Sequence, residues 1–213
     1  MDIVILASAS SRRRSWLSEK IIGANIGLEF WELEDSEPRP KSGSEVKEQV
    51  FESCLHKAKL ASSTIGGSGS EEDVRIIVVS DTLVEDPDDH LVALGKPMDK
   101  ASAVSTLIRL SGRRHVVWSS TALLERDAGG IELDEGWKAS IWTDFSIVEF
   151  EEIREEEIGG VLDSGAWQGK AGGYDLAGNA EKFARVVEGE EVTVLGFSSR
   201  AIGDLEDRLA RRM

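Results

Sequence analysis

A segment near the N-terminus combines the residue types that bind phosphate. An apolar run at residues 3–7 is followed by serines and arginines, at Ser8, Ser10, Ser11, Arg12, Arg13 and Arg14. Serine hydroxyls and free backbone N–H groups at a helix N-terminus can hold phosphate oxygens. Arginines at this positive end of a helix are disfavoured by roughly a few tenths of a kcal/mol each, and a bound anion would reverse that sign. Ordinary serine capping, with the arginines turned into solvent, explains the same pattern.

A second candidate is Ser80-Asp81-Thr82, which comes at the end of the apolar run at residues 75–80. A carboxylate at the end of a buried strand, facing a crevice, is a common metal ligand or general base. A turn-initiating or helix-capping aspartate gives the same pattern and is commoner. Asp81 is therefore a candidate for catalysis, with a structural alternative left open.

Lysines supply further candidates. Lys96 lies in Gly95-Lys96-Pro97, which lacks the glycine-rich approach and the following Ser or Thr of a P-loop. Lys57 and Lys59 are two residues apart on an expected helix, so they cannot both face one site. Lys170 lies in a glycine-rich segment, residues 169–174, which could contact a nucleotide or simply connect two elements.

The charge balance restricts the partners. The 213 residues include 40 acidic and 25 basic side chains, a formal net charge of −15. This charge disfavours nonspecific binding to nucleic acids and to anionic membrane surfaces. A site for an anionic nucleotide then needs a local cluster of cations, and the arginines and lysines above supply one.

Cysteine and histidine usage restricts the metal chemistry. Cys54 is the only cysteine, which excludes an internal disulfide and a cysteine-based zinc cluster. The histidines at positions 56, 90 and 115 are scattered, so any metal must bind to carboxylates, as Mg²⁺ or Mn²⁺ prefers. No apolar run is long enough to span a membrane and no secretory leader is present, so we expect a cytoplasmic protein.

The elements that must position these residues follow from hydrophobic periodicity. Strands are expected at 3–7, 28–33, 75–80, 91–94, 115–125 and 137–150, with one more before the C-terminal helix; helices are expected at 11–20, 42–62, 100–110, 151–158 and the C-terminus. Ser42 and Glu45 have the spacing of a capping box, and Asp99 is a good N-cap. Val104, Leu107 and Ile108 should form the buried face of the helix at 100–110. Strands interleaved with helices indicate one α/β domain, residues 1–213, around a central sheet.

Four segments resemble the Maf family, in the family's order and over essentially the whole chain. They are ILASASSRR, VVSDTLV, LGKPMDKASAVSTLIRLSGRRHVV and GKAGGYDLAGNAEKFARVVEG. The resemblance implies a mixed, twisted β-sheet with flanking helices, similar to the inosine triphosphatases, and an active-site cleft between two lobes. It also implies hydrolysis of a nucleoside triphosphate to the monophosphate and pyrophosphate, a divalent metal, and a homodimer as a possible assembly.

The resemblance also assigns residues by position. Asp81 looks like the family's proton acceptor, and Arg12 and Thr82 look like the branch that prefers dTTP and UTP. A carboxylate is expected after the second strand, where Glu34 or Asp35 could join Asp81 as a metal ligand. The triphosphate would be bound by the N-terminal segment and by two lysines, at Ser8, Ser10, Arg12, Arg13, Lys57 and Lys96.

The sequence departs from the family pattern at two single positions and in one short segment. Ser11 and Ser198 stand where the family has proline, and Tyr174-Asp175-Leu176-Ala177-Gly178 replaces Tyr-Gly-Ile-Gln-Gly. The glutamine is associated with base choice, and Ala177 offers no hydrogen bond, which should weaken discrimination between bases. Two alternative functions therefore stay open. One is hydrolysis with a preference for an inosine- or xanthosine-type triphosphate, and the other is nucleotide binding without hydrolysis.

Overall fold

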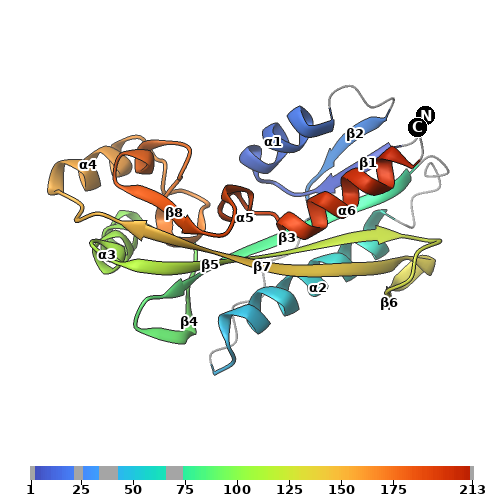
Figure 1. Ribbon diagram of the computed structural model, residues 1–213, viewed down its shortest axis with the longest axis horizontal. Coiled ribbons are helices and arrows are strands. Elements are labelled where there is room, and N and C mark those ends of the chain that lie inside the picture. The colour runs from blue at the N-terminus through green and yellow to red at the C-terminus, as the bar shows by residue number, and fades with distance from the viewer. Residues whose placement is uncertain (1–2, 22–25, 34–42, 66–73, 212–213) are drawn as a thin grey trace.

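One mixed sheet contains every strand in the part of the chain that the computed structural model describes, residues 3–21, 26–33, 43–65 and 74–211 (Figure 1). Its main order is β2-β1-β3-β5-β7-β6, with β4 paired to β3 and β8 paired to β7. The strands are β1 (Ile3–Ala7), β2 (Gly27–Trp31), β3 (Val74–Asp86), β4 (Asp89–Leu94), β5 (Arg114–Glu125), β6 (Ile131–Glu132), β7 (Lys138–Phe150) and β8 (Ala184–Glu188).

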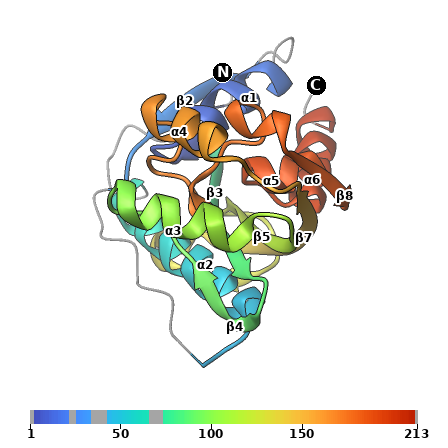
Figure 2. The ribbon, with the colours of Figure 1, turned by 90° about the vertical axis from the view of Figure 1, so that its left-hand side faces the viewer.

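Helices cover both faces of this sheet (Figure 1). Helix α2 lies on one face, while α1 and α6 lie on the other; α3 and α4 lie side by side at the far end (Figure 2). The helices are α1 (Ser11–Ile21), α2 (Val46–Ile65), α3 (Lys100–Leu110), α4 (Glu155–Asp163), α5 (Glu191–Leu195) and α6 (Ser199–Ala210), with 3₁₀ turns η1 (Asp134–Gly136), η2 (Ala171–Gly173) and η3 (Asn179–Lys182). The predicted α/β class with a mixed central sheet is confirmed.

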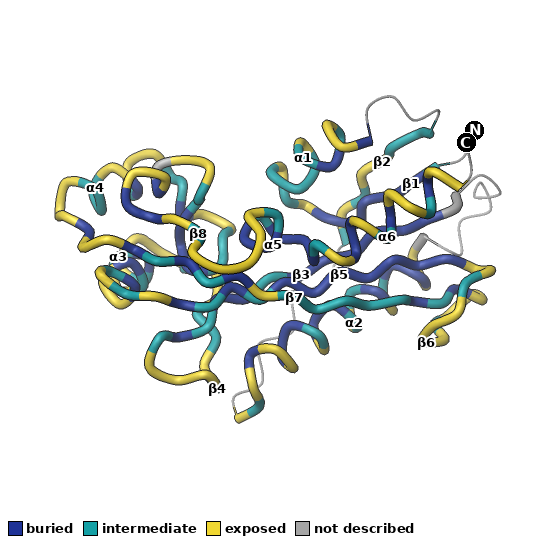
Figure 3. Tube along the Cα trace, in the orientation of Figure 1, coloured by how far each residue is buried: buried dark blue, intermediate teal, exposed yellow. Residues whose placement is uncertain are grey.

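The two faces of β1 enter two different cores, as the alternation of side chains along a strand requires. Ile5 packs with Cys54 and Ala58 of α2, whereas Leu6 packs with Leu17 of α1 and Leu205 of α6. A third core lies at the other end of β5 and β7, under α3 and α4 (Figure 3). The long strands β3, β5 and β7 therefore connect two lobes that have separate cores.

Three local predictions need correction. The second helix begins at Val46 and not at residue 42; Ser42, the predicted cap, lies outside the described residues. The buried face of α3 consists of Ala103, Leu107 and Leu110, while Ile108 is 59% exposed. The acidic helix starts at Glu155 and not at residue 151. Residues 151–154, between β7 and this helix, have neither helical nor strand structure.

The helix α3 otherwise starts where its sequence predicts. Asp99 accepts a hydrogen bond from the Ser102 backbone N–H at 2.7 Å, and the Ser102 hydroxyl accepts one from the Asp99 backbone N–H at 3.0 Å, which completes a capping box. This cap satisfies N–H groups that have no partner inside the helix. The Ser102 hydroxyl also accepts from the Met98 backbone N–H at 3.1 Å, which ties the cap to the end of the loop that carries Lys96. No helix in the described ranges is long and apolar enough to cross a membrane.

Candidate active site

A gap in strand pairing along one edge of β3 creates the site. β1 pairs with β3 up to Leu6 opposite Val78, and β4 pairs with the same edge only from Val84 onward. On the opposite edge, β5 pairs without interruption from Ile77 to Val84. Residues 79–83 therefore carry a strand neighbour on one side only, and a cavity opens on the other.

This cavity has a volume of about 370 Å³ and receives residues from both lobes. It is lined by Ala7, Ser8, Ala9, Ser10, Ser11, Arg12, Arg13, Leu33, His56, Lys57, Leu60, Ser80, Asp81, Thr82, Val84, Lys96, Val117, Gln168, Gly169, Lys170, Ala171, Tyr174 and Val194. A cleft between two lobes was predicted, and the structure confirms it. The prediction that Asp81 ends a strand is wrong, because β3 pairs with β5 as far as Val84 and with β4 from Val84 to Asp86.

The loop after β1 presents the serines to the cavity. The Ser10 backbone N–H donates to the Ser8 hydroxyl at 3.2 Å, and the Arg13 N–H donates to the Ser10 hydroxyl at 3.4 Å. Arg14 turns away, donating to the Ser8 carbonyl at 2.8 Å and pairing with Glu32. The structure thus separates the three neighbouring arginines, with Arg12 and Arg13 at the cavity and Arg14 bracing its loop.

Arg13 connects three segments of chain. Its guanidinium donates to the Gly196 carbonyl at 3.0 Å, the Ser80 carbonyl at 3.0 Å and the Thr82 hydroxyl at 2.8 Å. The Ser80 carbonyl lies in the part of β3 that has no strand neighbour on this side, so Arg13 takes the place of a missing strand partner. Thr82 is held further by the Ser119 hydroxyl at 2.8 Å. Arg13 therefore shapes the cavity wall, in addition to lining it.

Asp81 is paired with Lys57. Lys57 Nζ donates to Asp81 Oδ1 at 2.8 Å, and both side chains are largely buried, with 15% and 10% of their surface exposed. Lys59, two residues along α2, is exposed. The expectation that only one of these lysines faces the site is confirmed.

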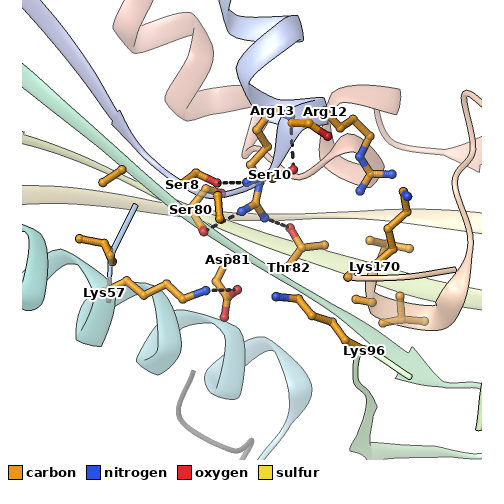
Figure 4. A pocket seen from close by; sticks show the side chains of 18 of the residues that line it. Ser8, Ser10, Arg12, Arg13, Lys57, Ser80, Asp81, Thr82, Lys96 and Lys170 are labelled. Carbon is orange, nitrogen blue, oxygen red and sulfur yellow. Dashed lines mark hydrogen bonds and ion pairs between the residues drawn. The ribbon is translucent and has the colours of Figure 1, made fainter. Parts of the chain in front are cut away.

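Three further cations border the cavity (Figure 4). Lys96 extends toward Asp81 and Thr82 from the loop before α3, while Arg12 and Lys170 approach each other from opposite lobes. Arg12 Nη1 lies 3.1 Å from Asp175 Oδ1, and Lys170 Nζ lies 3.6 Å from Asp175 Oδ2. The Nε of Arg12 is buried and has no hydrogen-bond partner among the residues that the structure describes. A buried donor without a partner is costly in an unliganded protein, so it marks a place for a ligand acceptor.

Tyr174, which lines the cavity, belongs to a buried group of aromatic and histidine side chains. The Tyr174 hydroxyl lies 2.9 Å from His115 Nε2, and both rings pack edge-on against Phe150. Burial lowers the pKa of His115 to about 3 and raises the pKa of Tyr174, because each charged form would lose its hydration. Both groups are neutral at pH 7, and the buried surroundings of His115 favour a structural role for it.

Of three further predicted ligands, one is described by the structure, and it does not line the cavity. Glu34 and Asp35 lie outside the described residues. Ala177 is exposed and is absent from the lining of the cavity among the described residues. Trp167, which precedes the glycine-rich segment in sequence, is 6% exposed and belongs to the core of the second lobe.

Sequence reasoning missed two residues that the structure brings to the site. His56 lines the cavity beside Lys57, but no ligand spacing pointed to it. Asp175 was noted only as part of a departure from the family pattern, although it contacts two of the cations. The available signal was that Asp175 and Lys170 lie close together in sequence, in a segment with few other charged residues.

Comparison with known proteins identifies relatives over nearly the whole chain. A dTTP/UTP pyrophosphatase of Hahella chejuensis is 31% identical over 194 residues, 91% of this chain and 86% of the relative. One from Zymomonas mobilis is 32% identical, covering 91% of this chain and 85% of the relative. The Ham1 protein of Staphylococcus aureus is only partly alike in structure, at 11% identity and a TM-score of 0.43 over 70% of this chain and 72% of its own. The family described as "Maf-like protein" matches residues 3–207, and the chain belongs to the Maf family.

Proposed function

We propose that this protein hydrolyses nucleoside triphosphates between the α and β phosphates, with dTTP, UTP or related nucleotides as substrates. The observation that carries the proposal is the cavity: its described lining residues include five cations and one carboxylate, Asp81, in a chain of net charge −15. The cations are Arg12, Arg13, Lys57, Lys96 and Lys170. The curated names of the relatives support the choice of dTTP and UTP.

The residues present fit a divalent cation such as Mg²⁺ or Mn²⁺. Among the described residues no group of three or more His, Cys, Asp or Glu could hold a metal ion alone. Mg²⁺, however, commonly binds through one or two carboxylates together with substrate phosphates. Asp81 supplies one such carboxylate, and Glu34 or Asp35 would supply a second. Bound there, the ion would neutralise charge on the phosphate oxygens.

In the proposed reaction a water molecule attacks the α-phosphorus, and the bond from that phosphorus to the α,β-bridging oxygen breaks. Pyrophosphate leaves with the bonding electron pair, and the nucleoside monophosphate keeps the oxygen of the water. Lys57 occupies Oδ1 of Asp81, so we assign the other carboxylate oxygen to orienting the water and accepting its proton.

The cations act by positioning and neutralising the phosphate chain, which is the main requirement of phosphoryl transfer. Arg12 can donate from its Nε, and Ser8 and Ser10 can donate from their hydroxyls. Lys96 would reach the phosphate chain from the other lobe. Arg13 holds Thr82 and the exposed edge of β3 in place. Cytoplasmic location and a homodimer remain predictions.

The test is release of pyrophosphate from a panel of natural and modified nucleoside triphosphates with Mg²⁺ or Mn²⁺, run beside Asp81→Asn. We expect release from dTTP or UTP, with turnover lower by about 10²- to 10⁴-fold in the variant. Preference for an inosine- or xanthosine-type triphosphate would overturn the substrate choice. Binding without release would favour a regulatory protein, and near-normal turnover in folded Asp81→Asn would remove Asp81 from catalysis.

A further inference from the structure

Asp175 places a negative charge between two cations of the proposed phosphate site. Its two carboxylate oxygens contact Arg12 at 3.1 Å and Lys170 at 3.6 Å, and the three side chains are 21–23% exposed. Arg12 comes from the start of α1, whereas Lys170 comes from the segment before η2 in the other lobe. Asp175 therefore joins the lobes across one rim of the cavity.

The backbone holds Asp175 in this place. Its carbonyl accepts hydrogen bonds from the Gly178 N–H at 3.1 Å and the Ala180 N–H at 3.2 Å. The preceding residue, Tyr174, is buried and tied to His115. The side chain of Asp175 is short, so a backbone fixed on both sides keeps the carboxylate within reach of the two cations.

We infer that Asp175 is a specificity-determining residue that competes with phosphate oxygens for Arg12 and Lys170. The inference rests on the proposed function, because it assigns these cations to the phosphate chain. A carboxylate and a phosphate group accept the same charge-assisted hydrogen bonds from Arg and Lys. An incoming anion must displace Asp175 or share the cations with it, and either event weakens anion binding.

This competition sets a charge threshold for the ligand. A triphosphate carries more negative charge than either of its hydrolysis products, so it competes best with one carboxylate. After cleavage, pyrophosphate and the nucleoside monophosphate hold the cations separately and with less charge. Asp175 can then regain Arg12 and Lys170, which would promote release of the products.

A purely structural role for Asp175 predicts the opposite effect of its removal. If Asp175 only held Arg12 and Lys170 in a binding geometry, its loss would loosen both side chains and weaken anion binding. If it competes, its loss raises the local positive charge and strengthens binding. The sign of the change in affinity therefore distinguishes the two roles, and damage to the fold cannot imitate a gain in affinity.

The test is calorimetric titration of the full chain with inorganic pyrophosphate and with tripolyphosphate in EDTA, for Asp175→Asn, Asp175→Ser, Asp175→Glu and wild type. We expect the Asn and Ser variants to bind about three- to tenfold more tightly, with a steeper dependence on salt, and the Glu variant to resemble wild type. Asp163→Asn is the matched control, because Asp163 is exposed, pairs with Lys100 and does not line the cavity.

Hydrolysis is measured separately on the same proteins. Competition would be supported if Asp175→Asn lowers both the inhibition constant of pyrophosphate and the KM of the substrate. At high salt, kcat/KM of the variant should not rise above the wild-type value to match. Unchanged or weaker anion binding in both uncharged variants, including no detectable binding, would overturn the inference. Since the titrations need no turnover, tighter binding in a chain that hydrolyses nothing would support it while removing the proposed function.

Discussion

Lys57 Nζ donates to Asp81 Oδ1 at 2.8 Å, which ties the middle of α2 to the middle of β3. The pair lies where β3 has no strand neighbour on the cavity side. Its two charges are mostly removed from solvent, so the interaction is screened less by salt than a surface ion pair would be. The carboxylate is thereby held in one orientation facing the proposed phosphate site.

Replacing Lys57 should reduce turnover sharply. In Lys57→Met, Asp81 loses its ammonium partner and the phosphate chain loses a cation, so we expect kcat to fall by about 10²-fold or more. Lys59→Met is the matched control, because Lys59 lies on the same helix and is exposed. Pyrophosphate release under saturating substrate measures the effect. Equal activity of the two folded variants would contradict the role of Lys57.

Lys96 should contribute to binding more than to turnover. It is exposed at the rim of the cavity, where a single charge acts on a substrate that solvent still screens. We expect Lys96→Ala to raise KM by about three- to tenfold with a smaller change in kcat. Lys100→Ala removes a nearby exposed lysine that pairs with Asp163 and does not line the cavity, so its kinetics should match wild type. A large fall in kcat alone would instead place Lys96 at the reacting phosphate.

Much of the fold could be predicted because local signals and tertiary contacts agree. Asp99 and Ser102 form the cap that the sequence indicated, and α3 runs over Lys100–Leu110 as expected. The strand β3 could not be bounded in the same way, because Ser80-Asp81-Thr82 interrupts its apolar run. These polar residues remain in a strand since β5 offers polar partners in register, Thr121 opposite Ser80 and Ser119 opposite Thr82.

The site was predictable in its residue types but not in its contacts. The N-terminal arginines share one sequence pattern, yet Arg13 binds carbonyls on two distant segments while Arg12 reaches Asp175. These partners are 67 to 183 positions away in sequence, so no local periodicity encodes them. Asp175 could not be predicted as a site residue for the same reason, because its contact with Arg12 depends on where the fold places the start of α1.

The glycine that faces Arg13 gives a sensitive test of that connection. Gly196 has a φ of 127°, and a Cβ there would lie 2.5 Å from Arg13 Nε. We expect Gly196→Ala to lower the free energy of unfolding by about 1–3 kcal/mol and to reduce activity, because Arg13 must leave Ser80 or Thr82. Gly203→Ala is the contrasting variant: it lies in α6 with nothing within 4 Å of the new Cβ, and should stabilise by about 0.5–1 kcal/mol. Urea unfolding measures both, and equal stabilities would contradict the expectation.

The buried His115 should make stability depend on pH. Burial lowers its pKa to about 3, while in the unfolded chain it titrates near the ordinary value of 6.5. Between these values the unfolded state binds more protons, so stability rises with pH and is lost as the pH falls below 6.5. From pH 7.5 to pH 5.0 this group should cost about 2 kcal/mol of unfolding free energy.

The measurement is urea unfolding of wild type, His115→Gln and His90→Gln at pH values from 7.5 to 5.0. His115→Gln can still hydrogen-bond to Tyr174 but cannot be protonated, so its stability should fall by about 2 kcal/mol less than wild type over this interval. His90 is exposed, and its variant should follow the wild-type curve. Because the comparison is between slopes, a uniform loss of stability in His115→Gln does not affect it. Parallel curves for His115→Gln and wild type would show that His115 is already protonated, or solvated, in the folded protein.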